Sequence, residues 1–308
     1  MFRKTRFGIA ISGGGCKAFF GLGVGAVLRD AGLNLVSYSG ASAGSAMAAS
    51  LFARNYRDVV RYFRSVTLRN PSNFHFRNLF LGARPFPHER IYRRAVRTYM
   101  DWRVFVESKE RIAINALEVP HELYPTSFAR ARLLVRIVDA FRKEMKLYRE
   151  GRYKSLLSEC VRACGLVEKV FRNEDIDSPE HLEDIILASS SVPPMVKFQK
   201  VKGRYYLDGG ITRNLPVALL ENVDVAIGIY YNFWTRLQYE GVNVVDGGQE
   251  IEKMEKGKKA GPRVILVSPE RDLPIQTWDY ANPRGIELAY EAGLRAGEHL
   301  LPVVKKMR

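Results

Sequence analysis

Short apolar runs, separated by glycine-rich or polar segments, predict a series of buried strands along the chain. The first run lies at 7–12 and ends at three glycines. Continuous apolar runs of this length are typical of strands that are covered on both faces. The other predicted strands lie at 34–39, 111–117, 204–207, 223–230 and 263–267.

Helical patterns follow the first two predicted strands. The run 19–30 is apolar and stops before Gly32, and a run of small residues at 46–52 predicts the next helix. Three glycines inside the first helix cost about 1 kcal/mol each relative to alanine. Such a helix is favourable only if its glycines allow close packing against a sheet. The alternation of strand and helix predicts a three-layer α/β/α fold with a mainly parallel central sheet.

The middle of the chain is basic and amphipathic. Residues 56–110 alternate basic and apolar positions, which predicts surface helices with arginine-rich outer faces. Residues 128–156 hold the clearest amphipathic pattern, and 284–304 predict a terminal helix. We expect the apolar stripe of 128–156 to face the protein, although a basic amphipathic helix can also lie in a membrane interface. That stripe consists of Leu134, Val138, Phe141, Met145 and Tyr148.

Length and charge narrow the class of protein. The 308 residues are enough for one large domain, and 236–262 is a polar segment that we expect to be a mobile loop. The net charge of +15 favours anionic partners, such as a phospholipid surface, nucleic acid or an acidic protein.

Cysteine usage and hydropathy bear on the compartment. Three cysteines are too few for a disulfide framework, and Cys160 and Cys164 have no neighbours that complete a zinc set. The N-terminal basic residues precede an apolar stretch that glycines interrupt too early for a signal peptide. The sequence has no apolar run of about 18 residues that could span a membrane. We therefore expect a cytoplasmic protein, and peripheral attachment to a membrane stays open.

The first candidate for chemistry is a serine in a turn of small residues. Ser42 lies between a predicted strand and a predicted helix, which is the context of a nucleophile on a strained turn. Five small residues also form ordinary turns, so the motif needs support from the rest of the chain. It reads Gly40-Ala41-Ser42-Ala43-Gly44.

A glycine loop after the first strand supplies candidate donors for an oxyanion. Gly13, Gly14 and Gly15 lack Cβ atoms and can turn successive N–H groups toward one point, and the amide of Ala43 could join them. The loop also fits a dinucleotide fingerprint, but no acidic residue ends the second strand to hold a ribose. A P-loop is excluded because Lys17 is not followed by Ser or Thr.

Two candidates exist for the base that activates the serine. His299 with an earlier acid would complete a Ser-His-Asp triad, but this histidine lies on the terminal helix rather than after a strand. Asp208 directly follows a strand, and Gly209 and Gly210 leave room beside it. A second Asp-Gly-Gly at 246–248 lies in the polar segment, and we interpret it as a turn.

In combination, these segments resemble the patatin-like phospholipase family. The chain has the Gly-Gly-Gly-x-Lys loop, then Gly-Ala-Ser-Ala-Gly about one βα unit later, and a distal Asp-Gly-Gly. Residues 188–193 are similar to the family's Ala-Ser-x-x-x-Pro segment, and 214–216 to its Asn-x-Pro. These anchors cover most of 6–230, and in this order they are highly specific.

The resemblance implies a Ser–Asp dyad without histidine, in which Ser42 is the nucleophile and Asp208 accepts its proton. An ordinary carboxylate, with a pKa near 4, is a weak base. We expect burial to raise the pKa of Asp208 and so to make it a stronger base. The implied oxyanion hole is shaped by Gly13, Gly14, Gly15 and Cys16. Supporting motif positions are Lys17, Ala18, Gly40, Gly44, Gly209 and Gly210, of which Lys17 and Ala18 depart from the family's common arginine and glycine.

The implied activity is that of a lipid acyl hydrolase of the phospholipase A or lysophospholipase type, with an acyl-serine intermediate and no metal or cofactor. We expect one domain over 1–308, in which a helical insertion at 118–180 forms a cap. The partners of the protein would be a lipid or acyl-ester substrate and, in peripheral contact, an anionic membrane, and we expect that it binds no nucleic acid. The alternatives are a catalytically silent module that binds anionic lipid or nucleic acid, and a Ser-His-Asp esterase that uses His299.

Overall fold

The computed structural model describes residues 4–76, 86–152, 154–193, 195–231, 244–246, 249–251 and 261–307. The strands are β1 (Phe7–Ile11), β2 (Leu35–Gly40), β3 (Arg111–Val119), β4 (Val167–Arg172), β5 (Gln199–Val201), β6 (Arg204–Asp208), β7 (Val225–Ile229), β8 (Val244–Asp246), β9 (Gln249–Ile251) and β10 (Arg263–Val267). The helices are α1 (Phe19–Asp30), α2 (Ala43–Phe52), α3 (Tyr56–Leu68), α5 (His88–Tyr99), α6 (Trp102–Glu107), α7 (Ser127–Arg149), α8 (Leu156–Ala163), α9 (Pro179–Ser189) and α11 (Pro283–Lys305).

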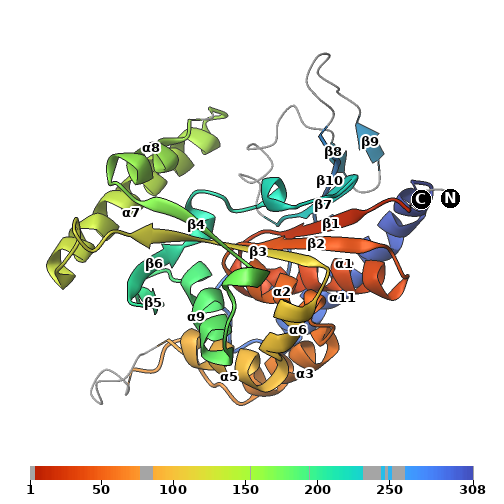
Figure 1. The fold of residues 1–308 in the computed structure, drawn as a ribbon, viewed down its shortest axis with the longest axis horizontal. Coiled ribbons are helices and arrows are strands. Elements are labelled where there is room, and N and C mark those ends of the chain that lie inside the picture. Colours follow the sequence, from red (N-terminus) through yellow and green to blue (C-terminus); the bar gives the residue numbers. More distant parts are fainter. Residues whose placement is uncertain are drawn as a thin grey trace.

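Eight of these strands form one central sheet, in the order β10-β7-β1-β2-β3-β6-β5, with β4 added beside β3. The five strands from β10 to β3 run parallel to their neighbours. The pairs of β3 with β4, of β3 with β6 and of β5 with β6 are antiparallel. The prediction of a mainly parallel sheet is therefore confirmed (Figure 1).

Strand β3 joins the parallel and antiparallel parts. It pairs with β2 along 111–114 and with β6 along 116–119, whereas β4 pairs along 113–118. Because β4 overlaps both of the other ranges, β2 and β6 must share the opposite edge of β3. One of them runs parallel to β3 and the other antiparallel, so their carboxyl ends meet.

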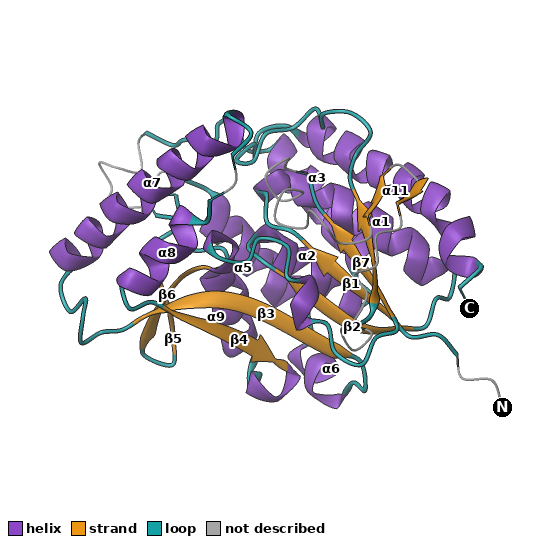
Figure 2. Ribbon diagram, turned by 90° about the horizontal axis from the view of Figure 1, so that it is seen from above, coloured by secondary structure: helices purple, strands orange, loops and turns teal. Residues whose placement is uncertain are grey.

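Helices cover both faces of the sheet, which confirms the three-layer α/β/α architecture (Figures 1 and 2). On one face α1, α2, α3, α5, α9 and α11 share a large apolar core with the strands. On the other face α7 and α8 pack over β3 and β6, and the segment 215–220 packs over β1, β7 and β10.

Polar side chains cap several of these helices and fix where they begin. Ser178 accepts a hydrogen bond from the His181 amide at 3.1 Å at the start of α9. Thr126 does the same for α7, and Asn282 for α11. Such caps satisfy amides that have no partner within the helix.

The glycines of α1 have a partly different role from the one expected. A Cβ atom at Gly21 would meet Ile11 of β1, as close packing on the sheet requires. A Cβ at Gly23, however, would lie 2.3 Å from the carbonyl oxygen of Tyr290, and one at Gly293 would lie 2.1 Å from that of Phe20. These two glycines let α1 and α11 approach backbone to backbone, so the packing is helix on helix as well as helix on sheet.

Other expectations are corrected in detail. The helix predicted at 128–156 ends at Arg149, and the region 118–180 contains β4 in addition to α7 and α8. In α7 the buried residues Leu133, Ile137 and Ala140 each lie one residue before a position of the predicted stripe, whereas Tyr148 is buried as predicted. Within 236–262, residues 244–246 and 249–251 form the β8–β9 hairpin, and most of the remainder lies outside the described residues.

Candidate active site

Ser42 lies in the turn between β2 and α2 with a backbone conformation that is unusual for a residue with a side chain. Its φ is 54° and its ψ is −133°. Positive φ values cost a non-glycine residue of order 1 kcal/mol and persist where the surroundings impose them. A Cβ at Gly44 would lie 2.3 Å from the carbonyl oxygen of Ile11, so the glycine lets α2 start directly against β1. The predicted strained turn is therefore present.

The topology of β3 brings Asp208 to this serine. Gly40, at the end of β2, pairs with Ile114, and Asp208, at the end of β6, pairs with Ala116. The two strand ends thus converge on one edge of β3, separated by Asn115. The buried Asn115 amide donates to the carbonyl oxygen of Gly209 at 2.9 Å and holds the turn after Asp208 in place.

Asp208 has a strongly perturbed carboxyl group. It is 4% exposed, and burial raises its pKa from 3.8 to about 7. A hydrogen bond from the Ser42 side chain and one from the Gly210 amide, at 2.6 Å, oppose that rise. A carboxylate with a pKa near 7 is a far better proton acceptor at neutral pH than an ordinary aspartate.

The amides of the glycine loop are not equivalent. The amide of Gly13 donates to Asn214 at 3.0 Å and that of Cys16 donates to Thr277 at 2.9 Å. Within the described part of the chain, the amides of Gly14, Gly15 and Ala43 have no such acceptor. Of the residues predicted for the oxyanion hole, Gly14, Gly15 and Ala43 therefore have backbone amides without an acceptor among the described residues, whereas the amides of Gly13 and Cys16 bond within the protein.

The loop is closed by the segment around Thr277. Gly15 has a φ of +58°, and a Cβ at this position would lie 1.8 Å from the Thr277 carbonyl oxygen. Burial raises the pKa of the Cys16 thiol to about 12, so this thiol stays protonated and packs as a small apolar group. Lys17 is half-buried and Ala18 is buried in the short 3₁₀ turn that leads into α1.

The end of α9 holds both members of the pair, a role that the sequence motif alone did not reveal. The Ser42 amide donates to the Ser189 hydroxyl at 3.0 Å. The Asp208 amide donates to the carbonyl oxygen of Ser191 at 2.9 Å. The serine-rich segment 188–193 therefore positions the two backbones relative to each other.

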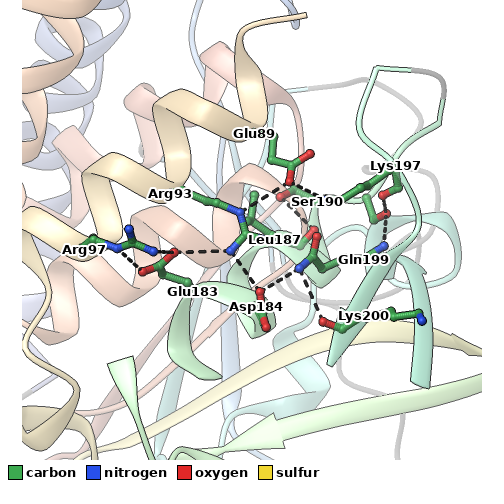
Figure 3. A network of polar contacts seen from close by, with 11 residues as sticks. Glu89, Arg93, Arg97, Glu183, Asp184, Leu187, Ser190, Lys197, Gln199 and Lys200 are labelled. Atoms are coloured by element: carbon green, nitrogen blue, oxygen red, sulfur yellow. Dashed lines mark hydrogen bonds and ion pairs between the residues drawn. The ribbon is translucent and has the colours of Figure 1, made fainter. Parts of the chain in front are cut away.

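A network of charged side chains connects α9 to its neighbours α5 and β5 (Figure 3). Glu183, 1% exposed, accepts hydrogen bonds from Arg97 at 2.8 Å and from Arg93 at 3.3 Å. Asp184 accepts from Arg93 at 3.0 Å and from Gln199 at 2.7 Å. These contacts tie α9 to α5 and β5.

A cavity of about 370 Å³ opens over the serine and the aspartate. Helix α7 supplies much of its apolar wall, and Val138 and Phe141 are 43% and 44% exposed at its side. Thr277 and Trp278 also line it, and no sequence motif marked them because they lie in an irregular segment. The apolar lining consists of Leu134, Ile137, Val138, Phe141, Leu157, Val192, Pro193, Leu207, Ile211 and Trp278.

Two other candidates lie elsewhere. His299 is exposed on α11, 3.7 Å from Glu270, and lines a different cavity from the one at Ser42. Asp246 ends β8 and pairs with Gln249, whereas Gly247 and Gly248 lie outside the described residues. The described residues contain no group of three His, Cys, Asp or Glu side chains that could hold a metal ion. Nor does any described helix have the length and hydropathy of a membrane span.

A serine on a strained turn, a buried carboxylate beside it and amides without an acceptor among the described residues are the groups that nucleophilic acyl transfer uses. Residues 9–220, more than half of the chain, match the family described as Patatin-like phospholipase. The chain belongs to the patatin-like phospholipase family, which confirms the resemblance in its sequence. VipD from Legionella pneumophila aligns with a TM-score of 0.39 and 14% identity, over 96% of this chain and 67% of that one. No curated protein matches the chain.

Proposed function

We propose that the protein is a lipid acyl hydrolase that works through Ser42 and Asp208. Membership of the patatin-like phospholipase family supports a lipid hydrolase in general. The observation that carries the finer proposal is that the strained Ser42 and the buried Asp208 face the same cavity, where burial raises the pKa of Asp208 to about 7 and the Ser42 hydroxyl opposes that rise. A nucleophile and a base within hydrogen-bond reach are the minimum set for acyl transfer.

The reaction proceeds in two acyl-transfer steps. Asp208 takes the proton of the Ser42 hydroxyl as its oxygen attacks the ester carbonyl, and the amides of Gly14, Gly15 and Ala43 stabilise the tetrahedral oxyanion. Collapse of this intermediate releases the alcohol, which takes the proton back from Asp208 and leaves an acyl-serine. Water then attacks the acyl-serine with Asp208 again as base, and the fatty acid leaves.

The cavity suits an acyl chain rather than a polar substrate. Its walls are mainly apolar side chains from α7, α8 and the segment 192–193. Burial of apolar surface contributes about 25 cal/mol per Å², which favours a long acyl chain over a short one. In our proposal the region 118–180 is the cap that forms this wall, and esters of fatty acids are the substrate class.

A covalent probe tests the proposal directly. A fluorophosphonate reacts with activated serines, and we expect it to label Ser42, as located by mass spectrometry of the digested protein. Labelling should disappear in Ser42→Ala and be slowed by orders of magnitude in Asp208→Asn, which keeps the shape but removes the base. His299→Ala is the matched control and should be labelled at the normal rate.

The same experiment distinguishes the alternatives. Loss of labelling in His299→Ala would favour a Ser-His-Asp esterase. If vesicles and detergent are present and Ser42 is still not labelled, the dyad proposal is wrong. A catalytically silent module that binds anionic lipid would then account for the fold and the charge.

A further inference from the structure

A second cavity, of about 590 Å³, lies between α3 and α5, away from the proposed active site. It shares no lining residue with the cavity at Ser42. Figure 1 shows α3 and α5 on the face of the sheet opposite α7 and α8. The polar and charged residues of its lining are Arg61, Ser65, Arg69, Asn70, His75, Arg90 and Arg94, with Tyr62 and Tyr99.

Helix α5 carries four arginines in two pairs that have different surroundings. Arg93 and Arg97 point to Glu183 and form the ion pairs of the network in Figure 3. Arg90 and Arg94, one turn apart, line the second cavity instead. No described carboxylate forms an ion pair with either of them. Carboxylates therefore neutralise the arginines on one side of α5, whereas no carboxylate of the described residues pairs with those on the other side.

Helix α3 and the residue after it add two further guanidinium groups to the same cavity. Arg61 pairs with Asp58 at 3.1 Å, but both side chains are half or more exposed and such pairs are weak. Arg69 also lines the cavity, and none of the lining residues is acidic. Burial raises the pKa of Tyr62, and the nearby charges of Arg94 and Arg90 oppose this rise. Both guanidiniums thus act on one phenol in the cavity wall.

The uncharged part of the lining is held in place. Asn70 is 8% exposed, donates to the carbonyl oxygen of Tyr280 at 2.7 Å and contacts the His75 ring nitrogen at 2.7 Å. The rings of Tyr62 and Tyr99 lie 5.5 Å apart, and the Tyr62 hydroxyl donates to Ile91 at 3.1 Å. These contacts hold the uncharged side of the cavity in a fixed arrangement, and the four arginines of the lining are exposed to solvent.

We propose that this cavity binds a phosphate-bearing ligand with more than one anionic group. Arg69, Arg90 and Arg94 line one cavity without an ion pair to any described carboxylate, and Arg61 has only a weak one. Like charges in one cavity repel, and a bound polyanion relieves that repulsion. The planar guanidinium group binds phosphate through two parallel hydrogen bonds, which makes arginine better suited than lysine to this task. The ligand is either the headgroup of a lipid or a soluble phosphate compound, since both present the same chemistry.

The test uses two probes on the full chain carrying Ser42→Ala, so that no lipid is hydrolysed. Inorganic tripolyphosphate, titrated by calorimetry, represents the soluble source. Phosphatidylcholine vesicles with and without a phosphatidylinositol bisphosphate represent the headgroup. We expect the double variant Arg90→Gln/Arg94→Gln to weaken binding of at least one probe by roughly tenfold or more, because two charge-assisted contacts are lost. The affinity of the variant Arg90→Lys/Arg94→Lys should lie between that of the parent chain and that of the double Gln variant.

The control variant is Arg103→Gln/Lys109→Gln, which removes the same charge from two exposed positions outside the cavity. It should bind both probes as tightly as the parent chain. Binding of tripolyphosphate that depends on Arg90 and Arg94 assigns a soluble ligand, and such dependence with the vesicles alone assigns a headgroup. The proposal is overturned if neither probe binds, or if the control weakens binding as much as the cavity variant, since the attraction would then be one of net charge.

Discussion

Asp208 is the residue whose chemistry depends most on its surroundings. Its carboxyl group is nearly fully buried, and its pKa is about 7 in the folded protein. A base must be ionised to accept the Ser42 proton, so its ionisation limits the reaction below that pH. The interactions with the Ser42 hydroxyl and the Gly210 amide keep the pKa of Asp208 from rising further.

We therefore predict that kcat/KM for a soluble ester rises tenfold per pH unit below about 7 and levels off above it. The measurement is a pH profile of kcat/KM from pH 4 to 9. A profile that is already flat at about pH 5 would show an aspartate with an ordinary pKa and would contradict the buried base.

The same pKa shift predicts a dependence of stability on pH. The carboxyl group has a higher pKa folded than unfolded, so ionisation destabilises the fold. This penalty is absent below about pH 4, grows up to about pH 7 and is complete above it. Asp208→Asn should thus unfold with a larger free energy than the parent at pH 8, by up to about 4 kcal/mol, and with a similar one below pH 4. Urea denaturation of both proteins at pH 8 and below pH 4 measures these free energies of unfolding. A difference between variant and parent that is the same at both pH values would contradict this effect of the Asp208 pKa on stability.

Ser42 stores backbone strain that a glycine would not carry. Its φ of 54° is left-handed, a region that glycine adopts freely. We predict that Ser42→Gly is more stable than Ser42→Ala by about 1 kcal/mol, although both are inactive. Comparing the two variants by thermal unfolding isolates the strain, because each lacks the hydroxyl. Equal stabilities would show that the turn relaxes without cost.

At the scale of single elements, the apolar stripe predicted for α7 is buried only in part: Tyr148 is buried and Leu134 packs against the core, but other positions are not. The sequence of α7 has two adjacent apolar rows, and periodicity alone does not say which one packs on the sheet. The structure buries Leu133, Ile137 and Ala140. Val138 and Phe141, expected in the core, are instead partly exposed beside the cavity at Ser42. An exposed apolar row beside basic side chains is the arrangement of an interfacial helix, which we propose for α7.

This proposal predicts a loss of membrane binding without a loss of chemistry. Removing the charges of Arg142, Lys143 and Lys146 should weaken binding to anionic phosphatidylserine vesicles by roughly tenfold or more, since each cation near such a surface contributes about 1 kcal/mol. Lys143 contributes less, because it pairs with Asp139 at 2.7 Å. Vesicle sedimentation measures the binding, and hydrolysis of a soluble ester should not change. Arg103→Gln/Lys109→Gln again serves as control, and unaltered binding of the triple variant would remove the interfacial role.

At the scale of the whole molecule, the two cavities lie on opposite sides of one sheet. The apolar cavity faces α7 and α8, and the arginine-lined cavity lies among the helices of the other face. Basic residues outnumber acidic ones on both sides, on α7 and on α3 and α5, and contribute to the net charge of +15.

The sequence by itself determined the local features of this protein. The apolar runs predicted the main strands, and the small-residue motifs identified Ser42, the glycine loop and Asp208. These features can be predicted from the sequence because turn geometry and the apolar pattern of a strand depend on residues that are neighbours in the chain.

Only the tertiary structure decided how these parts work together. It brought the ends of β2 and β6 together on one edge of β3 and bonded the amides of Gly13 and Cys16 to other acceptors. It also divided the arginines of α5 into a pair that binds Glu183 and a pair without a carboxylate partner among the described residues. It also buried Asp208 and so raised its pKa to about 7. Each of these outcomes depends on groups that are distant in sequence, and burial and hydrogen-bond partners are properties of the packed molecule.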